Sequence, residues 1–183
     1  MHRVALIGAG EVAHFYGAAL KSAGVQVPFI LVRRESAAAG ELAQQLGAKL
    51  CLQADTDWRS LDGVLSAVTG TQADIVAKAV MPHLSVGTLY MDLCTAEPQD
   101  MESMDALARQ HGIELADLAI MGSVPSTGAQ TALLAAGQGA GRAAAFWQVS
   151  GRFCAYLAGT GGGCNALEAA AQFDDQGAGG LGN

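Results

Sequence analysis

A glycine-rich segment directly after the first apolar run is the part of the chain best suited to binding a ligand. Residues 4–7 read Val-Ala-Leu-Ile, and a G-x-G-x-x-A motif follows at residues 8–13. The first glycine of this motif permits a tight turn, the second lets a pyrophosphate approach the backbone, and the alanine allows a helix to pack closely on the strand. The N-terminus of that helix offers free N–H groups and the positive end of its dipole to phosphates. We therefore predict a dinucleotide-binding turn formed by Gly8, Ala9, Gly10, Glu11 and Val12.

Two other interpretations of this motif stay open. It could be a tight strand–helix turn that binds no ligand. It could also be a methyltransferase-type glycine loop, but that loop usually has an acidic residue at the end of the first strand, where this chain has Leu6 and Ile7.

The second apolar run spans residues 29–32, and the basic residues that follow it bear on the choice of cofactor. NAD sites usually carry Asp or Glu at the end of this strand, where it accepts a hydrogen bond from the ribose 2′-hydroxyl. Here Arg33, Arg34, Glu35 and Ser36 follow Val32. Two guanidinium groups and a hydroxyl suit the 2′-phosphate of NADP. We predict NADP rather than NAD, with contacts from Arg33, Arg34 and Ser36; the alternative is a solvated arginine pair that Glu35 partly neutralises.

Short apolar runs alternate with stretches of helical spacing along most of the chain. We expect strands at residues 4–7, 29–32, 49–52, 64–68, 88–91, 115–120, 131–134 and 153–157, and helices at 11–23, 37–46, 73–80, 98–110 and 141–149. Strands alternating with helices of about ten residues indicate βαβ units and a parallel sheet. The predicted fold class is α/β: a single doubly wound, Rossmann-type domain with a mostly parallel sheet, whose last two strands are added to a six-stranded core. Val68 and Thr69, after the fourth strand, join the predicted cofactor contacts.

The composition excludes several classes of protein. The chain of 183 residues carries 10 basic and 17 acidic side chains, which give a formal net charge of −7. No basic run is present, so we expect no nucleic-acid partner. No apolar run reaches the roughly 18 residues of a membrane span, and the first residues lack a signal-peptide pattern. The four cysteines, Cys51, Cys94, Cys154 and Cys164, lack CxxC spacing and a neighbouring His, so we expect no metal site. We expect their thiols to be reduced and the protein to be cytoplasmic.

Three motifs together resemble those of a known family. The turn at 8–13 is followed by Met-Asp-Leu-Cys-Thr-Ala-Glu-Pro at 91–98 and by Asp-Leu-Ala-Ile-Met-Gly-Ser-Val at 117–124. Over about residues 1–165 the chain resembles the N-terminal, NAD(P)-binding half of the β-hydroxyacid dehydrogenases. This family includes 6-phosphogluconate and 3-hydroxyisobutyrate dehydrogenases and is similar to the imine reductases.

The resemblance implies a function. It implies an NADP-binding domain of an oxidoreductase that transfers hydride to or from a small hydroxy acid, carbonyl or imine. It also implies that Thr95 lies near the nicotinamide and that Ser123 is a candidate contact of the small-molecule substrate. The catalytic residue stays unknown.

The departures from the family pattern bear on activity. Cys94 and Met121 replace serines of the family motifs, and Leu167 stands where the resemblance aligns the catalytic lysine. The last lysine of the chain is Lys78. In the family a helical domain completes the substrate pocket and the dimer, and we expect this chain to lack it. We therefore expect a chain truncated before that domain, with a linker helix and a disordered glycine-rich tail at 166–183.

Two readings of the function follow from these departures. The resemblance implies that the lineage is that of an enzyme, but the chain alone is expected to be inactive. The alternative is a nucleotide-binding module without turnover, either a truncated product or a pseudoenzyme. We also expect self-association through the surface left by the missing domain, around Leu157 and Leu167.

Several other residues of reactive or aromatic types are predicted to have structural roles. His83 and His111 stand at predicted helix ends and favour surface or capping roles. Cys94 has no neighbouring His and favours a structural role, and Trp58 and Trp147 are expected to pack in the core. Turn formation, rather than a catalytic pair, is expected of Asp92 and Asp117.

Overall fold

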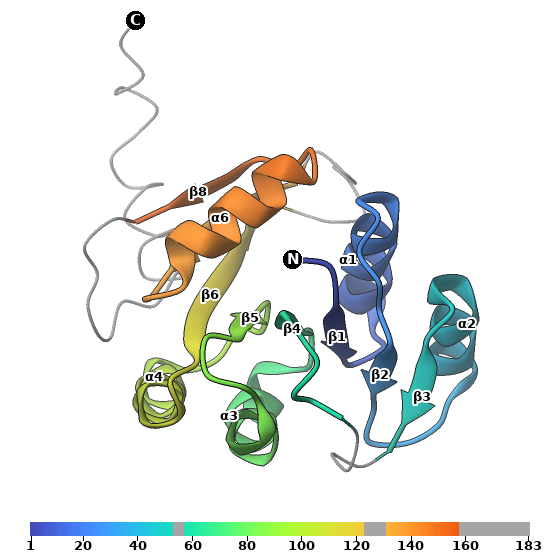
Figure 1. The fold of residues 1–183 in the computed structure, drawn as a ribbon, viewed down its shortest axis with the longest axis horizontal. Coiled ribbons are helices and arrows are strands. Elements are labelled where there is room, and N and C mark those ends of the chain that lie inside the picture. Colours follow the sequence, from blue (N-terminus) through green and yellow to red (C-terminus); the bar gives the residue numbers. More distant parts are fainter. Residues whose placement is uncertain (53–56, 123–130, 158–183) are drawn as a thin grey trace, which may run out of the picture.

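A computed structural model of the chain describes residues 1–52, 57–122 and 131–157. The strands in these residues form one sheet in the order β3-β2-β1-β4-β5-β6-β7-β8 (Figure 1). The first six follow the order 3-2-1-4-5-6 of a doubly wound dinucleotide-binding fold, which confirms the predicted fold class. The bounds of the eight strands are β1 Val4–Ile7, β2 Phe29–Leu31, β3 Lys49–Cys51, β4 Gly63–Ser66, β5 Leu89–Asp92, β6 Glu114–Met121, β7 Ala132–Ala136 and β8 Cys154–Tyr156.

The direction of the strands changes once across the sheet. Neighbouring strands from β3 to β6 pair in parallel, β7 pairs antiparallel with β6, and β8 pairs in parallel with β7. The last two strands therefore extend a parallel six-stranded core, as the sequence predicts. Because the core strands are parallel, their carboxyl ends meet at one edge of the sheet, where ligands bind in folds of this kind.

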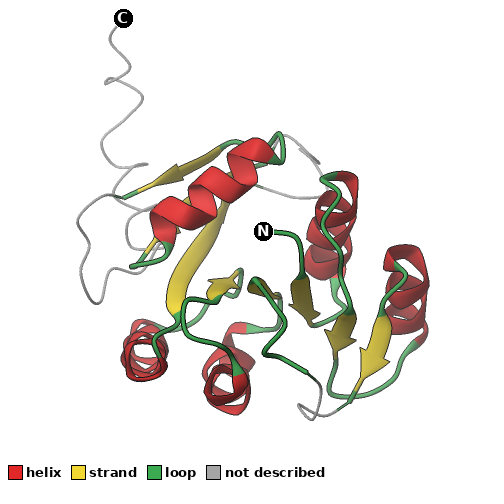
Figure 2. Cartoon of the chain, viewed as in Figure 1, coloured by secondary structure: helices red, strands yellow, loops and turns green. Residues whose placement is uncertain are grey.

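Helices cover both faces of the sheet (Figures 1 and 2). Helices α1 (Glu11–Ser22), α2 (Ala37–Leu46) and α6 (Ala140–Val149) pack on one face, and α3 (Gly70–Val80) and α4 (Pro98–His111) pack on the other. A short 3-10 helix, η1 (Met81–His83), follows α3. The predicted packing roles of the tryptophans are confirmed, because both are fully buried; Trp147 contacts Tyr16 edge-on at 5.5 Å and Trp58 contacts Phe29 at 4.9 Å.

Local signals mark most helix ends correctly. The Ser36 hydroxyl accepts a hydrogen bond from the Ala39 backbone N–H at 3.2 Å and caps α2. Gly47 and Gly112 end α2 and α4 in the left-handed conformation. The predicted start of α3 at residue 73 is wrong, because the helix begins at Gly70. Residues 70–72 carry no apolar side chain, so the apolar spacing misses the first turn.

The interpretation of Asp92 and Asp117 as turn formers is also wrong. Asp92 is the last residue of β5 and is fully buried, and Asp117 lies inside β6 and is buried too. The two residues are partners in the parallel pairing of these strands.

Three of the four cysteines, Cys51, Cys94 and Cys154, are free and buried. Cys164 lies outside the described residues, as do Leu167 and the predicted linker helix and tail at 166–183. Among the described helices, none has the length and apolar character needed to cross a membrane.

Candidate functional site

The turn between β1 and α1 has the geometry that a phosphate-binding loop needs. Gly8 adopts a φ of +98°, and a Cβ added there would lie 2.4 Å from the Ala67 carbonyl oxygen. The turn therefore approaches the end of β4 more closely than any side chain permits. Gly10 differs, because an added Cβ would meet no atom within 4 Å. Only glycine leaves the backbone open to a ligand at Gly10, which is the N-cap of α1.

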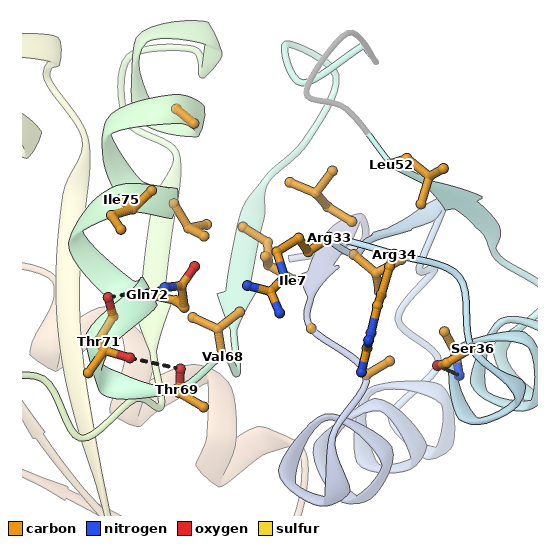
Figure 3. A pocket seen from close by; sticks show the side chains of 17 residues that line it. Ile7, Arg33, Arg34, Ser36, Leu52, Val68, Thr69, Thr71, Gln72 and Ile75 are labelled. Atoms are coloured by element: carbon orange, nitrogen blue, oxygen red, sulfur yellow. Dashed lines mark hydrogen bonds between the residues drawn. The ribbon is translucent and has the colours of Figure 1, made fainter.

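A pocket with a volume of about 670 Å³ opens beside this turn, at the carboxyl ends of β1, β2 and β4 (Figure 3). Seven of the predicted cofactor contacts line it, namely Gly8, Ala9, Arg33, Arg34, Ser36, Val68 and Thr69. Gly10, Glu11 and Val12 lie in the same turn and the first turn of α1 but do not line the pocket. The fold thus brings together segments that lie about 60 residues apart in the chain.

Arg33, Arg34 and Ser36 form the positively charged wall of the pocket. Both arginines are exposed, Arg33 points across the pocket toward Ile7 and Val68, and Arg34 lies between Arg33 and Ser36 (Figure 3). Within the part of the chain that the structure describes, neither arginine forms an ion pair with Glu35. The first turn of α2, which Ser36 caps, contains no acidic residue. This wall therefore combines two guanidinium groups with a helix N-terminus, which are groups that attract anions.

The opposite wall of the pocket is not predicted by the sequence beyond Val68 and Thr69. It contains Thr71, Gln72, Ile75 and Val76 of α3. Leu52, which directly follows β3, also lines the pocket. Leu52 and Ile75 are 49% and 59% exposed although both are large and apolar. The signal available in the sequence is topological, because residues that follow neighbouring parallel strands meet at one edge of the sheet.

The segment after β5 lies apart from the pocket. Thr95 is exposed but does not line the pocket, and its carbonyl oxygen lies so close to Gly70 that an added Cβ there would be 1.9 Å away. Burial raises the pKa of the Cys94 thiol, which is unfavourable for a nucleophile and agrees with a structural role. Ser123, the candidate substrate contact, lies outside the described residues.

The sequence matches the family model of the NAD binding domain of 6-phosphogluconate dehydrogenase over residues 3–155. The chain belongs to this family. The site described above is therefore that of an NAD-binding domain, and a nicotinamide cofactor is its ligand class. A comparison with curated proteins gave no significant match.

Solved structures of similar fold include both dehydrogenases and reductases. The chain is 27% identical to a conserved protein of unknown function that is described as similar to 3-hydroxyacid dehydrogenases, with a TM-score of 0.74 and coverage of 91% of this chain and 61% of that one. It is 25% identical to an imine reductase variant from Myxococcus stipitatus in complex with NAD+, with a TM-score of 0.73 and coverage of 97% and 60%. A 3-hydroxyisobutyrate dehydrogenase from Mycobacterium tuberculosis shares the fold at 21% identity, with a TM-score of 0.77 and coverage of 94% and 59%. The chain thus spans about three fifths of the length of these structures.

The residues of the domain fit a dinucleotide. The open backbone at Gly10 and the N-terminus of α1 can hold the pyrophosphate, and the pocket between Arg33 and α3 can hold the adenosine half. A dinucleotide held in this way would have its other half near the carboxyl ends of β4 and β5.

Proposed function

We propose that the chain is the NADP-binding domain of an oxidoreductase that selects NADP over NAD. The observation that carries this proposal is the wall formed by Arg33, Arg34 and Ser36 after β2, where an NAD site usually has a carboxylate. A carboxylate there accepts from the ribose hydroxyls and repels a phosphate, whereas guanidinium groups attract the 2′-phosphate.

The expected selectivity follows from the exposure of this wall. A hydrogen bond to a charged group contributes about 1.5–3 kcal/mol, which corresponds to roughly 10- to 150-fold in affinity. Because Arg33 and Arg34 are exposed, we expect the lower part of this range, and we expect the preference to shrink as salt screens the charges. The Ser36 hydroxyl caps α2 as an acceptor and keeps its own O–H to donate to the phosphate.

The proposed reaction class is hydride transfer to or from a small hydroxy acid, carbonyl or imine. The cofactor supplies or accepts the hydride when it is bound. The residues of this chain hold its pyrophosphate at Gly8–Gly10 and its phosphorylated ribose at Arg33 and Arg34, and Thr95 is the residue proposed to lie near the nicotinamide. As part of the same proposal the protein works in the cytoplasm, where the free thiols Cys51, Cys94 and Cys154 stay reduced.

A second candidate function is a nucleotide-binding module that does not turn over by itself. It is favoured by the positions of the chain's three lysines, because the family resemblance implies a catalytic lysine and each of these three lies elsewhere. Lys21 donates to the Gln45 carbonyl, Lys49 starts the edge strand β3 and Lys78 pairs with Asp74. None of them lines the pocket. We therefore propose that the isolated chain binds NADP but does not oxidise short 3-hydroxy acids. A rate of NADPH formation well above background in a purified sample would contradict this proposal and would show that the chain contains an acid–base group of its own.

We also propose that the isolated chain self-associates. Phe153 and Tyr156, at β8 on the edge of the sheet, are 69% and 52% exposed, and Leu157 follows them. Exposed apolar surface of this kind promotes association. Sedimentation velocity should show species larger than the 18.6 kDa monomer, and a single monomeric species would contradict this part of the proposal.

The NADP preference is tested by titrating NADPH and NADH into the wild type, Arg33→Ala and Arg34→Ala, followed by cofactor fluorescence. Each substitution should weaken the binding of NADPH by about tenfold and leave the affinity for NADH within about twofold of the wild-type value. Arg59→Ala is the matched control, because Arg59 is also exposed but does not line the pocket. Equal loss of both cofactors in the Arg33 and Arg34 variants would overturn the role of these residues in selectivity.

A further inference from the structure

Ser36 carries an exposed hydroxyl group in the positively charged wall of the pocket. It is the last residue of the loop between β2 and α2, and it lines the pocket next to Arg34 (Figure 3). Its backbone is extended, with φ −154° and ψ 160°. All residues from 33 to 38 are exposed. The hydroxyl therefore stands on an accessible, extended segment that the active site of another enzyme can bind.

The residues that precede Ser36 distinguish it from the other hydroxyl residues of the chain. Arg33 and Arg34 stand three and two positions before it, whereas no other serine or threonine of the sequence has two lysines or arginines among its three preceding residues. Among the described residues, neither arginine takes part in an ion pair. Protein kinases select their serines in part by the charge pattern around the acceptor. An exposed serine that follows two exposed arginines therefore suits a kinase with an acidic peptide-binding groove.

The surroundings of Ser36 stabilise a phosphoryl group once it is attached. The Ser36 Oγ accepts a hydrogen bond from the Ala39 backbone N–H at 3.2 Å, so a phosphoryl group on this oxygen lies at the N-terminus of α2. The first turn of α2 contains no acidic residue. Phosphate groups at a helix N-terminus and opposite arginines form charge-assisted hydrogen bonds. Glu35 is the acidic neighbour of Ser36, and because it is exposed, water and salt screen its repulsion.

We propose that Ser36 is a phosphorylation site and that its phosphorylation shifts the preference of the pocket from NADPH toward NADH. The inference rests on the proposed NADP preference. In the modification the Ser36 Oγ attacks the γ-phosphorus of ATP, which is held by a serine kinase that prefers arginines before the acceptor. A bond forms between Oγ and phosphorus, the bond between phosphorus and the bridging oxygen of ADP breaks, and the hydroxyl proton passes to the base of the kinase. Nothing is oxidised or reduced in this step.

Phosphorylation changes the charge of the wall that selects the cofactor. Phosphoserine carries a charge of about −1.5 to −2 at pH 7 and three acceptor oxygens. It engages the guanidinium groups of Arg33 and Arg34 that the 2′-phosphate of NADPH requires, and it repels that phosphate. The ribose hydroxyls of NADH are donors, and they can donate to phosphoserine as they do to the carboxylate of an NAD site. We therefore expect the affinity for NADPH to fall at least about tenfold and the affinity for NADH to stay within about threefold.

The effect of a negative charge at this position is tested with a matched pair of variants, Ser36→Asp and Ser36→Asn. Asp and Asn are both as favourable as serine at a helix N-cap, so both variants retain the cap of α2 and differ mainly in charge. Fluorescence titration should show NADPH binding at least about tenfold weaker in Ser36→Asp than in Ser36→Asn, with NADH affinities within about threefold of each other. Equal NADPH affinities in the two variants would overturn the proposed effect of phosphorylation.

The modification itself is tested by incubating the purified chain with magnesium ATP and the catalytic subunit of cyclic-AMP-dependent protein kinase, a kinase that prefers arginines before its acceptor serine. Mass spectrometry should locate the phosphate on Ser36 in the wild type. The control Ser22→Ala should take up phosphate like the wild type, because Ser22 is also exposed and follows Lys21 but does not line the pocket. Ser36→Ala should take up none.

The phosphorylated chain is then titrated with both cofactors beside the untreated chain. NADPH should bind at least about tenfold more weakly after phosphorylation, and NADH should change by less than about threefold. Absence of phosphate from Ser36, or an unchanged ratio of NADPH to NADH affinity in the phosphorylated chain, overturns the inference. An untreated chain that does not prefer NADPH overturns the proposed function instead, because the uptake of phosphate at Ser36 is measured independently of the cofactor.

Discussion

The two glycines of the turn after β1 allow the binding mode to be separated from the stability of the fold. We consider Gly8→Ala and Gly10→Ala as a matched pair of one-methyl substitutions. At Gly8 the methyl group would adopt φ +98° and lie 2.4 Å from the Ala67 carbonyl oxygen. A positive φ costs a non-glycine residue about 1–2 kcal/mol, and overpacking adds about 1–3 kcal/mol. The sum predicts a loss of about 2–5 kcal/mol in the free energy of unfolding.

At Gly10 the same methyl group costs little in the free protein. The backbone there is extended, with φ −79° and ψ −176°, and an added Cβ would meet no atom within 4 Å. We expect the free energy of unfolding to change by less than about 1 kcal/mol. The methyl group would, however, occupy the space where a pyrophosphate must contact the backbone. Loss of one charge-assisted hydrogen bond predicts at least about tenfold weaker cofactor binding.

Urea unfolding and NADPH titration of both variants measure the two effects. The expected pattern is a destabilised Gly8→Ala, and a Gly10→Ala that is as stable as the wild type but binds NADPH poorly. Wild-type affinity in Gly10→Ala would refute the proposed position of the pyrophosphate. Wild-type stability in Gly8→Ala would refute the close contact between the turn and the end of β4.

Two further predictions concern the segment after β5. Gly70→Ala should destabilise the chain by about 2–4 kcal/mol in urea unfolding, because its methyl group would lie 1.9 Å from the Thr95 carbonyl oxygen; Gly40→Ala in α2, where nothing lies within 4 Å, is the control and should stabilise by up to about 1 kcal/mol. Because the pKa of Asp92 is raised from 3.8 to about 6, folding favours its protonated form, and the stability that this residue contributes is lost as the pH rises from about 4 to 6. Asp92→Asn should therefore remove a pH-dependent change of about 3 kcal/mol over that range, and an unchanged pH profile of urea unfolding would contradict this account.

The parts of the site that are local in sequence could be predicted from the sequence. The turn at 8–13 carries its own backbone requirements, since Gly8 needs a positive φ and Gly10 needs open space. The cap at Ser36 is also local, because its acceptor and the Ala39 donor are three residues apart. The alternation of strands and helices follows from side-chain periodicity, which is a property of each segment alone.

The features that the sequence missed depend on contacts between distant segments. Leu52 and Ile75 face one pocket only because β3 and α3 approach the same edge of the sheet. The row formed by Ser66, Asp92 and Asp117 depends on the register of three strands, and no pattern within one strand specifies that register. The first turn of α3 escaped prediction because residues 70–72 carry no apolar side chain. The close approach of the Thr95 carbonyl, which leaves no room for a Cβ at Gly70, is a contact between distant segments.

The most direct test of the central claim is the ratio of the dissociation constants of NADH and NADPH for the wild-type chain, measured by isothermal titration calorimetry at low and high salt. The wall formed by Arg33, Arg34 and Ser36 predicts that NADPH binds about tenfold more tightly at low salt, and that this ratio falls as salt increases. Equal affinities, or tighter binding of NADH, would contradict the claim and would make Glu35 the better candidate for a partner of the ribose hydroxyls.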